Sequence, residues 1–292
     1  MAIIYQRHRT YSLIVGDRNG DGFEISNDLN ISFDINKVSS NKDRTNNATI
    51  EVTNLSKERQ KWLEQPYIGV VLSVGYHNTT VKRLFAGQAV NVSTRKSGID
   101  TITQIQLGSG YVELNHQNIS KVVPEGKTVK EAINETVKDI PGINRTVFNG
   151  VNINSPLLDG YPVSGTGREV LDELAKAYEL DWNLDDGVLQ VYDSSGTATD
   201  DLNTAFVISR SSGLIDLPYF VQGDVRRKKD DKAKKAGVQV KILLNPEIVP
   251  GSIVKIEDEN FNGFYKVSSL RSYGEWRGND WYTDLRLEQK IK

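Results

Sequence analysis

Alternating apolar and polar residues dominate the first third of the chain. The pattern recurs in six segments, at residues 11–15, 31–35, 48–52, 70–74, 84–92 and 101–107. Because successive side chains of a strand point to opposite faces, this period of two predicts strands with one buried face. Between two of these segments, residues 56–64 are largely charged and include no β-branched side chain, which predicts a short helix.

The hydrophobic period changes in the middle of the chain. Apolar residues at helical spacing predict two amphipathic helices, one with Val129, Ala132, Ile133, Val137 and Ile140, the other with Val170, Leu171, Leu174 and Tyr178. Each helix opens with a capping box, Thr128 with Glu131 and Thr166 with Glu169, in which hydroxyl and carboxylate each satisfy a backbone N–H. After the second helix, residues 180–184 and 188–192 flank a tight Asp-Asp-Gly turn and predict a β-hairpin.

A polar segment at residues 196–203 marks a domain boundary, because it is poor in large apolar side chains. Strand patterning then resumes to the C-terminus, interrupted by a basic stretch at residues 226–235. The sequence therefore predicts a mainly β (α+β) fold. Two β-barrel or sandwich domains, residues 1–117 and 197–292, would flank a small α/β insert domain with two helices at residues 118–196.

A faint internal repeat links the first and last sections. Three segments match in the same order: residues 48–52 with 236–240, 69–74 with 251–256, and 103–107 with 283–287. Gly69 precedes Thr103 by 34 residues, and Gly251 precedes Thr283 by 32. Alternating strands can resemble one another by chance, but the shared order and spacing favour a duplicated module.

Composition narrows the classes of function. The 36 basic and 38 acidic residues give a net charge of −2, so the whole chain has no strong attraction to nucleic acid or an anionic membrane. The absence of cysteine excludes disulfides, thiolate catalysis and cysteine-containing zinc sites. No apolar run approaches the ~20 residues that a membrane span needs, and the first residues do not resemble a signal peptide. We expect a soluble protein made in the cytoplasm.

One segment resembles the first half of a calcium-binding loop. Asp17, Asn19 and Asp21 place oxygen ligands at alternate positions, and Gly22 follows. The twelfth position is Asp28 in place of glutamate, and strand-like residues flank the segment. A polar turn between two strands explains the same residues, so we predict no bound metal and keep these three only as a weak candidate site.

Two features are candidates for contact with a partner. The stretch at residues 226–235 can attract phosphate or an acidic protein surface, but it has no aromatic side chain for base stacking, and a solvated loop explains it equally well. Trp276 lies in a turn region near the C-terminus and is the aromatic residue most suited to meet a partner. The basic candidates are Arg226, Arg227, Lys228, Lys229, Lys232, Lys234 and Lys235.

No catalytic constellation is present in the sequence. The three histidines lie far apart, and no Gly-x-Ser-x-Gly motif occurs. Adjacent carboxylates such as Asp185 and Asp186 point to opposite faces of a strand and cannot act together across a sugar ring. We therefore predict that the protein is not an enzyme and has no cofactor.

Taken in order along the chain, several segments resemble phage tail baseplate hub proteins. Residues 31–35, 48–55, 75–76 and 84–87 are similar to the opening barrel of those hubs. The resemblance continues through 165–178, 180–182, 186–189 and 244–251. The resemblance covers nearly the whole chain, and the segments follow the same order. Hubs of this type are trimers with two tail-tube-like β-barrels per subunit.

The resemblance implies a structural role in the virion. A homotrimer would present six barrels and so adapt a six-fold tail tube to a three-fold spike or fibre complex around a DNA channel. The implied partners are the tail tube or tube-initiator protein, the central spike or fibre protein, other baseplate proteins, and genomic DNA that passes without sequence-specific binding. Synthesis in the host cytoplasm and assembly into the tail baseplate follow from the same resemblance.

Two alternatives remain open from the sequence. A tail-associated peptidoglycan hydrolase is one, but it requires catalytic residues that the sequence does not provide. A carbohydrate- or receptor-binding module is the other, since β-rich chains with clustered Trp and Tyr can bind glycans. That reading gives the duplicated barrel no purpose.

Overall fold

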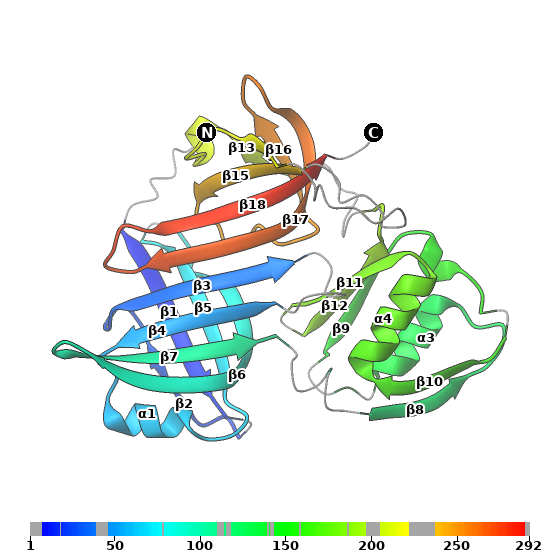
Figure 1. Ribbon diagram of the computed structural model, residues 1–292, viewed down its shortest axis with the longest axis horizontal. Helices are drawn as coiled ribbons and strands as arrows, with labels where there is room; N and C mark the ends of the chain where they lie inside the picture. Colours follow the sequence, from blue (N-terminus) through cyan, green and yellow to red (C-terminus); the bar gives the residue numbers. More distant parts are fainter. Residues whose placement is uncertain are drawn as a thin grey trace.

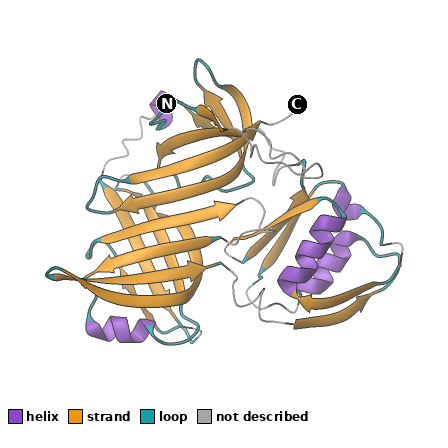
Figure 2. Cartoon of the chain, viewed as in Figure 1, coloured by secondary structure: helices purple, strands orange, loops and turns teal. Residues whose placement is uncertain are grey.

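The computed structural model describes residues 8–17, 19–38, 46–77, 79–109, 114, 118–138, 140, 143–157, 159–185, 187–196, 205–221 and 237–289. The fold is mainly β, as predicted. A large curved sheet forms one side of the molecule and a smaller unit with two helices packs beside it (Figure 1). The colouring by element type shows how strongly strands predominate (Figure 2).

One 13-stranded sheet joins the first and last sections of the described chain. Its hydrogen-bonded order is β14-β15-β18-β17-β3-β4-β7-β6-β5-β1-β2, and β16 and then β13 branch from β17. The strands of the first section are β1 (Arg9–Gly16), β2 (Gly22–Ile25), β3 (Ile31–Val38), β4 (Asn47–Thr53), β5 (Gly69–Tyr76), β6 (Lys82–Ser97) and β7 (Asp100–Gly108). Those of the last section are β13 (Phe206–Ile208), β14 (Tyr219–Val221), β15 (Gly237–Leu243), β16 (Ile253–Glu257), β17 (Asn262–Glu275) and β18 (Trp281–Gln289).

The helices lie where the sequence predicts them. They are α1 (Lys57–Leu63), α3 (Val129–Val137) and α4 (Gly167–Ala177), with short 3-10 turns η1 (Asn152–Asn154) and η3 (Arg210–Ser212). In the insert, β8 (Asn118–Val123) pairs with β10 (Tyr161–Thr166). The predicted hairpin forms between β11 (Leu180–Asp185) and β12 (Val188–Asp193), and β9 (Arg145–Asn149) adds in parallel to β12. The pattern of the sequence did not predict β8, β9 and β10.

Both predicted capping boxes are present. Thr128 accepts a hydrogen bond from the backbone N–H of Glu131, whose carboxylate accepts one from the N–H of Thr128 at 2.8 Å. Thr166 and Glu169 repeat the arrangement at the start of α4. These reciprocal bonds fix where the two helices begin.

Glu131 makes the first of these boxes sensitive to pH. The hydrogen bond from Lys127 and the backbone bond of Thr128 lower the pKa of Glu131 to about 2. A depressed carboxylate pKa adds stability above the unfolded pKa, and this contribution disappears as pH falls from about 4.5 toward 2. We expect Glu131→Gln to lower the melting temperature at pH 6 and to match the wild type near pH 2. A difference that is equal at both pH values would contradict this role.

Three separate clusters of buried apolar residues lie inside the described parts of the first section, the insert and the last section. Leu244 and Trp281 belong to the last section by sequence but pack in the first cluster. The division at 117/118 and 196/197 falls beside residues outside the described set. We therefore keep the three-domain division as a proposal, with three cores to support it.

The predicted internal repeat has a counterpart in strand topology. The strand path β4-β7-β6-β5 in the first section corresponds to β15-β18-β17-β16 in the last. β6 and β17 each carry a bulge, next to Leu107 and Leu287 respectively, which the sequence match also pairs. The two sections therefore contain equivalent four-strand modules.

A second shared detail is a hydroxyl pair between neighbouring strands. Thr94 and Thr103 Oγ atoms lie 3.2 Å apart, and Ser272 and Thr283 Oγ atoms lie 3.0 Å apart at the equivalent position. On β15 the sequence match needs a correction: strand pairing makes Ala48 equivalent to Val238, where the match gave residue 236. A shift of two residues keeps every side chain on the same face, so alternation alone could not detect it.

Candidate functional site on the joined sheet

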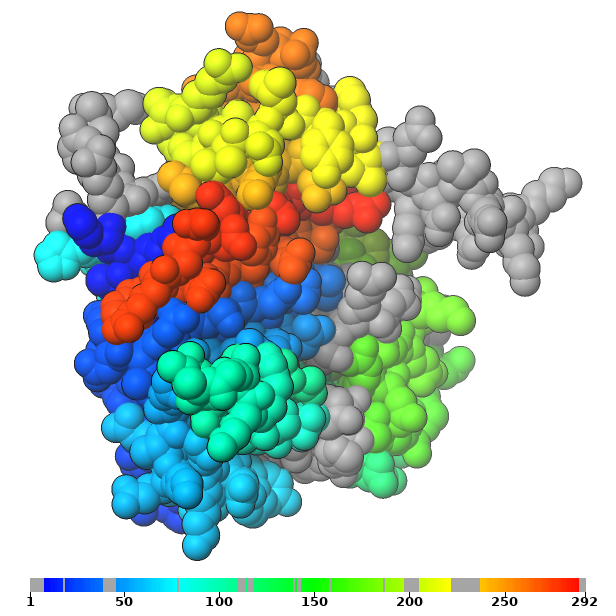
Figure 3. Space-filling model, turned by 60° about the vertical axis from the view of Figure 1, so that its left-hand side comes forward, coloured from blue at the N-terminus to red at the C-terminus, as the bar shows by residue number. Residues whose placement is uncertain are grey.

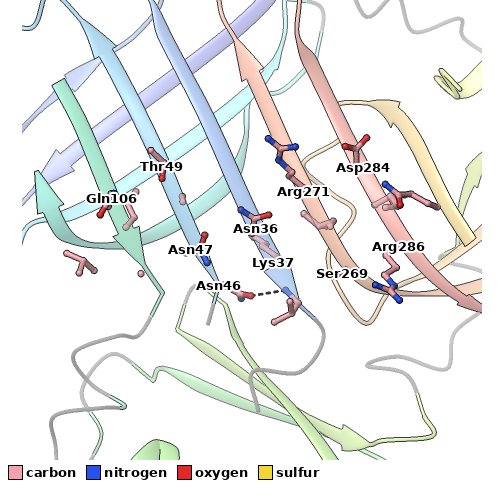
Figure 4. A pocket seen from close by; sticks show the side chains of 18 residues that line it. Asn36, Lys37, Asn46, Asn47, Thr49, Gln106, Ser269, Arg271, Asp284 and Arg286 are labelled. Carbon is pink, nitrogen blue, oxygen red and sulfur yellow. Dashed lines mark hydrogen bonds between the residues drawn. The ribbon is translucent and has the colours of Figure 1, made fainter. Parts of the chain in front are cut away.

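The outer face of the joined sheet is hollowed where the two modules meet. A concavity of about 800 Å³ lies over β15, β18, β17, β3, β4 and β7. Figure 4 shows polar side chains from these strands along it, among them Asn36, Asn47, Thr49, Gln106, Ser269, Arg271, Asp284 and Arg286. Successive side chains of a strand point to opposite faces of the sheet, which explains why this face is polar while the other face fills the cores.

An ion pair crosses the seam between the modules. β17 pairs with β3 in antiparallel register, with Tyr273 opposite Asp34. Arg271 donates from Nε to Asp34 Oδ1 at 3.1 Å and from Nη2 to Asp34 Oδ2 at 2.5 Å. The hydrogen bond to Asp34 raises the pKa of Arg271. This bidentate contact fixes the orientation of the Arg271 and Asp34 side chains on the outer face.

Beside the seam, aromatic and charged groups form a compact cluster. Lys241 Nζ lies 4.5 Å from the ring centroid of Tyr282 and 5.8 Å from that of Tyr273. Interaction with Tyr273 raises the pKa of Lys241. Burial raises the pKa of Asp284, and the charges of Lys241 and Arg271 offset part of that effect. Charges of both signs are thus interspersed over the concave face.

A buried polar group connects the insert to the ends of β3 and β4. Lys37 Nζ lies 2.6 Å from Asp185 Oδ2 at the tip of the insert hairpin. Asn46, which is 0% exposed, donates to Asn183 Oδ1 at 2.9 Å and accepts from the N–H of Val38 at 3.0 Å. Because these groups are removed from water, their mutual bonds fix the position of the insert beside the concave face.

The turn between β17 and β18 lies against strand β1 of the first section. Figure 3 shows this hairpin, in orange-red, next to the blue N-terminal strands. Trp276 donates from Nε1 to the carbonyl of Arg9 at 3.0 Å and packs edge-on to Tyr11, with ring centroids 5.4 Å apart. Arg9 in turn donates to the carbonyl of Glu275 at 2.9 Å. Trp276 is thus half-buried within its own chain, and its contact with a partner stays a prediction.

The calcium-loop candidates Asp17, Asn19 and Asp21 are not among the residues that line the concavity. Asp17 Oδ1 accepts the backbone N–H groups of Asn19 at 2.8 Å and Asp21 at 3.0 Å, so the carboxylate stabilises its own turn between β1 and β2. Within the described part of the chain, no group of three potential metal-ligating side chains occurs. All seven basic candidates, Arg226, Arg227, Lys228, Lys229, Lys232, Lys234 and Lys235, lie outside the described residues.

Sequence reasoning missed two features of the surface. The residues that form the concavity are polar members of ordinary alternating strands, so no local motif distinguishes them. His8 and His77, far apart in sequence, lie with ring centroids 6.4 Å apart because the flanking residues Arg9 and Tyr76 pair between β1 and β5. Only long-range strand pairing brings these residues together.

The fold is that of phage tail proteins. A tail protein from Neisseria meningitidis superimposes with a TM-score of 0.64 at 13% identity, over 96% of both chains. The 43 kDa tail protein of prophage MuSo2 from Shewanella oneidensis gives a TM-score of 0.64 at 10% identity, over 96% of this chain and 97% of the other.

A component of the E. coli type VI secretion system, described as structurally similar to the T4 bacteriophage tail proteins gp27 and gp5, is a third example. Its TM-score is 0.61 at 10% identity, over 90% of this chain and 73% of the other.

No protein-family model and no curated protein sequence matches the chain. No helix among the described residues is long and apolar enough to cross a membrane.

Proposed function

We propose that the chain is a structural subunit of a phage tail baseplate hub. Three copies would form a ring of six modules around a channel, and the ring would join a six-fold tail tube to a three-fold spike or fibre complex. The observation that carries this proposal is the edge-to-edge joining of two topologically equivalent modules within one chain. The fold shared with tail proteins supports it.

The concave polar face would form the inner wall of the channel. A wall for passing DNA must not hold phosphates strongly, and strong non-specific binding needs an excess of basic side chains. Here Arg271 is paired with Asp34, and Lys241 lies near Asp284, so the basic charge of the wall is largely balanced.

The proposed hub has several partners, all within the virion tail. They are a second and third copy of the chain, the tail tube, the spike, other baseplate proteins, and DNA in transit.

The proposal requires self-association without enzymatic activity. Size-exclusion chromatography coupled to light scattering should give a molar mass three times that of the 32.7 kDa subunit. A zymogram with purified protein should show no lysis of peptidoglycan. A monomer at every concentration would contradict the ring, and a lytic band from the pure chain would favour a hydrolase.

A further inference from the structure

Several strand edges of the joined sheet carry no partner among the described residues, and two of them, on β6 and β14, belong to strands of the repeat. Within the described part of the chain, β6 pairs with β5 over residues 82–88, and beyond its bulge no strand pairs with the edge away from β7. In the same described residues, β14 pairs with β15 on one side and has no strand on the other. Both edges are exposed, since residues 93–97 of β6 are open to solvent and β14 presents Tyr219 and Phe220.

The repeat shows what each open edge corresponds to. β17 is equivalent to β6, and it leaves its neighbour β16 at the same bulge to pair with β3. β3 lies beside β4 as β14 lies beside β15, so β3 is equivalent to β14. The two modules are therefore joined inside the chain by a β17–β3 pairing. The two edges equivalent to it, on β6 and β14, have no partner strand among the described residues.

Burial supports this equivalence at the level of one residue. Ile35 pairs with Ala48 in the first module, and Phe220 pairs with Val238 in the second. Because Ala48 and Val238 are equivalent, Ile35 and Phe220 occupy equivalent positions. Ile35, covered by β17, is 0% exposed, whereas Phe220 is 71% exposed. Phe220 packs on Phe261, a member of the core of its module, with ring centroids 4.8 Å apart, and within the described part of the chain no strand covers its outer side.

We propose that the second half of β6 in one copy pairs in antiparallel register with β14 of the next copy. This inference rests on the proposed ring and names the contact that closes it. Ser272 lies opposite Ile35 at the internal seam, and their equivalents are Thr94 and Phe220. Thr94 of one copy therefore lies opposite Phe220 of the next copy.

The same register places Arg95 opposite Tyr219 of the next copy. A guanidinium over a tyrosine ring is a favourable contact, and this chain already uses one, with Arg271 Cζ 4.8 Å from the ring centroid of Tyr273. Because the two edges differ, the contact is head-to-tail, and such contacts can close into a ring. Covering Phe220 removes a large exposed apolar side chain from water.

The absence of cysteine from the natural chain allows a clean cross-linking test. Opposite residues of an antiparallel pair have Cα atoms about 4.5–5.5 Å apart, within the range of roughly 4.4–6.8 Å that a disulfide spans. We expect the full-length double variant Thr94→Cys/Phe220→Cys to form covalent oligomers under mild oxidation. The matched control, Thr94→Cys/Tyr219→Cys, should stay uncross-linked, because residue 219 points to the opposite face.

The outcomes separate this contact from the ring itself. Bands of dimer and trimer on a non-reducing gel for the first variant, at least tenfold stronger than for the control, support the pairing. An oligomer by light scattering with no specific cross-link overturns the pairing and leaves the ring intact. A monomer by light scattering with no cross-link overturns both.

Discussion

Replacing Trp281 with alanine should lower the free energy of unfolding by about 3–5 kcal/mol, the usual cost of removing a large buried aromatic ring. Trp281 is 1% exposed and belongs to the core of the first section, although β18 lies at the C-terminus. Its ring packs edge-on to Phe33 with centroids 5.1 Å apart. The cavity left by alanine would therefore weaken both sections together. Urea unfolding followed by fluorescence and circular dichroism measures the effect.

Trp281→Phe is the control for that substitution. It keeps an aromatic ring beside Phe33 and removes the indole N–H, which has no hydrogen-bond partner among the described residues. We expect it to cost less than half as much as Trp281→Ala. A loss below about 1 kcal/mol for the alanine variant would contradict the packing of the C-terminal hairpin in the first core.

Asp185→Ala should also lower the free energy of unfolding by about 3–5 kcal/mol, because it leaves the buried ammonium group of Lys37 without a counter-charge. The two side chains are 7% and 20% exposed, and their charged atoms lie 2.6 Å apart. We expect the loss to appear first as loosened docking of the insert. Limited proteolysis and thermal unfolding of the full chain measure it.

Two variants test the physical reason for this loss. Lys255→Ala breaks an ion pair with Glu257 of the same 2.6 Å length, but the side chains are 35% and 45% exposed, so the cost should be below about 1 kcal/mol. The double variant Lys37→Met/Asp185→Leu removes both buried charges and should recover most of the stability. If Asp185→Ala costs no more than Lys255→Ala, the buried pair does not hold the insert.

Local patterns predicted the strands and helices well because each depends on near neighbours in sequence. Thr128 and Glu131 form their cap within one turn, and residues 48–52 alternate within one strand. β9 escaped prediction because none of its side chains is fully buried and because its partner β12 is distant, with Leu189 opposite Thr146. Its five residues provide neither alternation nor a turn signal.

The concave face could not be predicted, because it depends on pairing between distant strands. Asp34 and Arg271 are 237 residues apart, and nothing local to either residue indicates that they meet. The faint repeat was the one sequence signal for this arrangement, since it predicted two equivalent modules. It did not show that β17 would pair with β3, a long-range contact of the kind that sequence periodicity cannot determine.

Negative-stain electron microscopy of the purified full-length protein tests the central claim most directly. We expect ring-shaped particles whose class averages have three-fold symmetry and near six-fold outlines, with a central channel. Compact single subunits at all concentrations, or closed dimers without a channel, would contradict it.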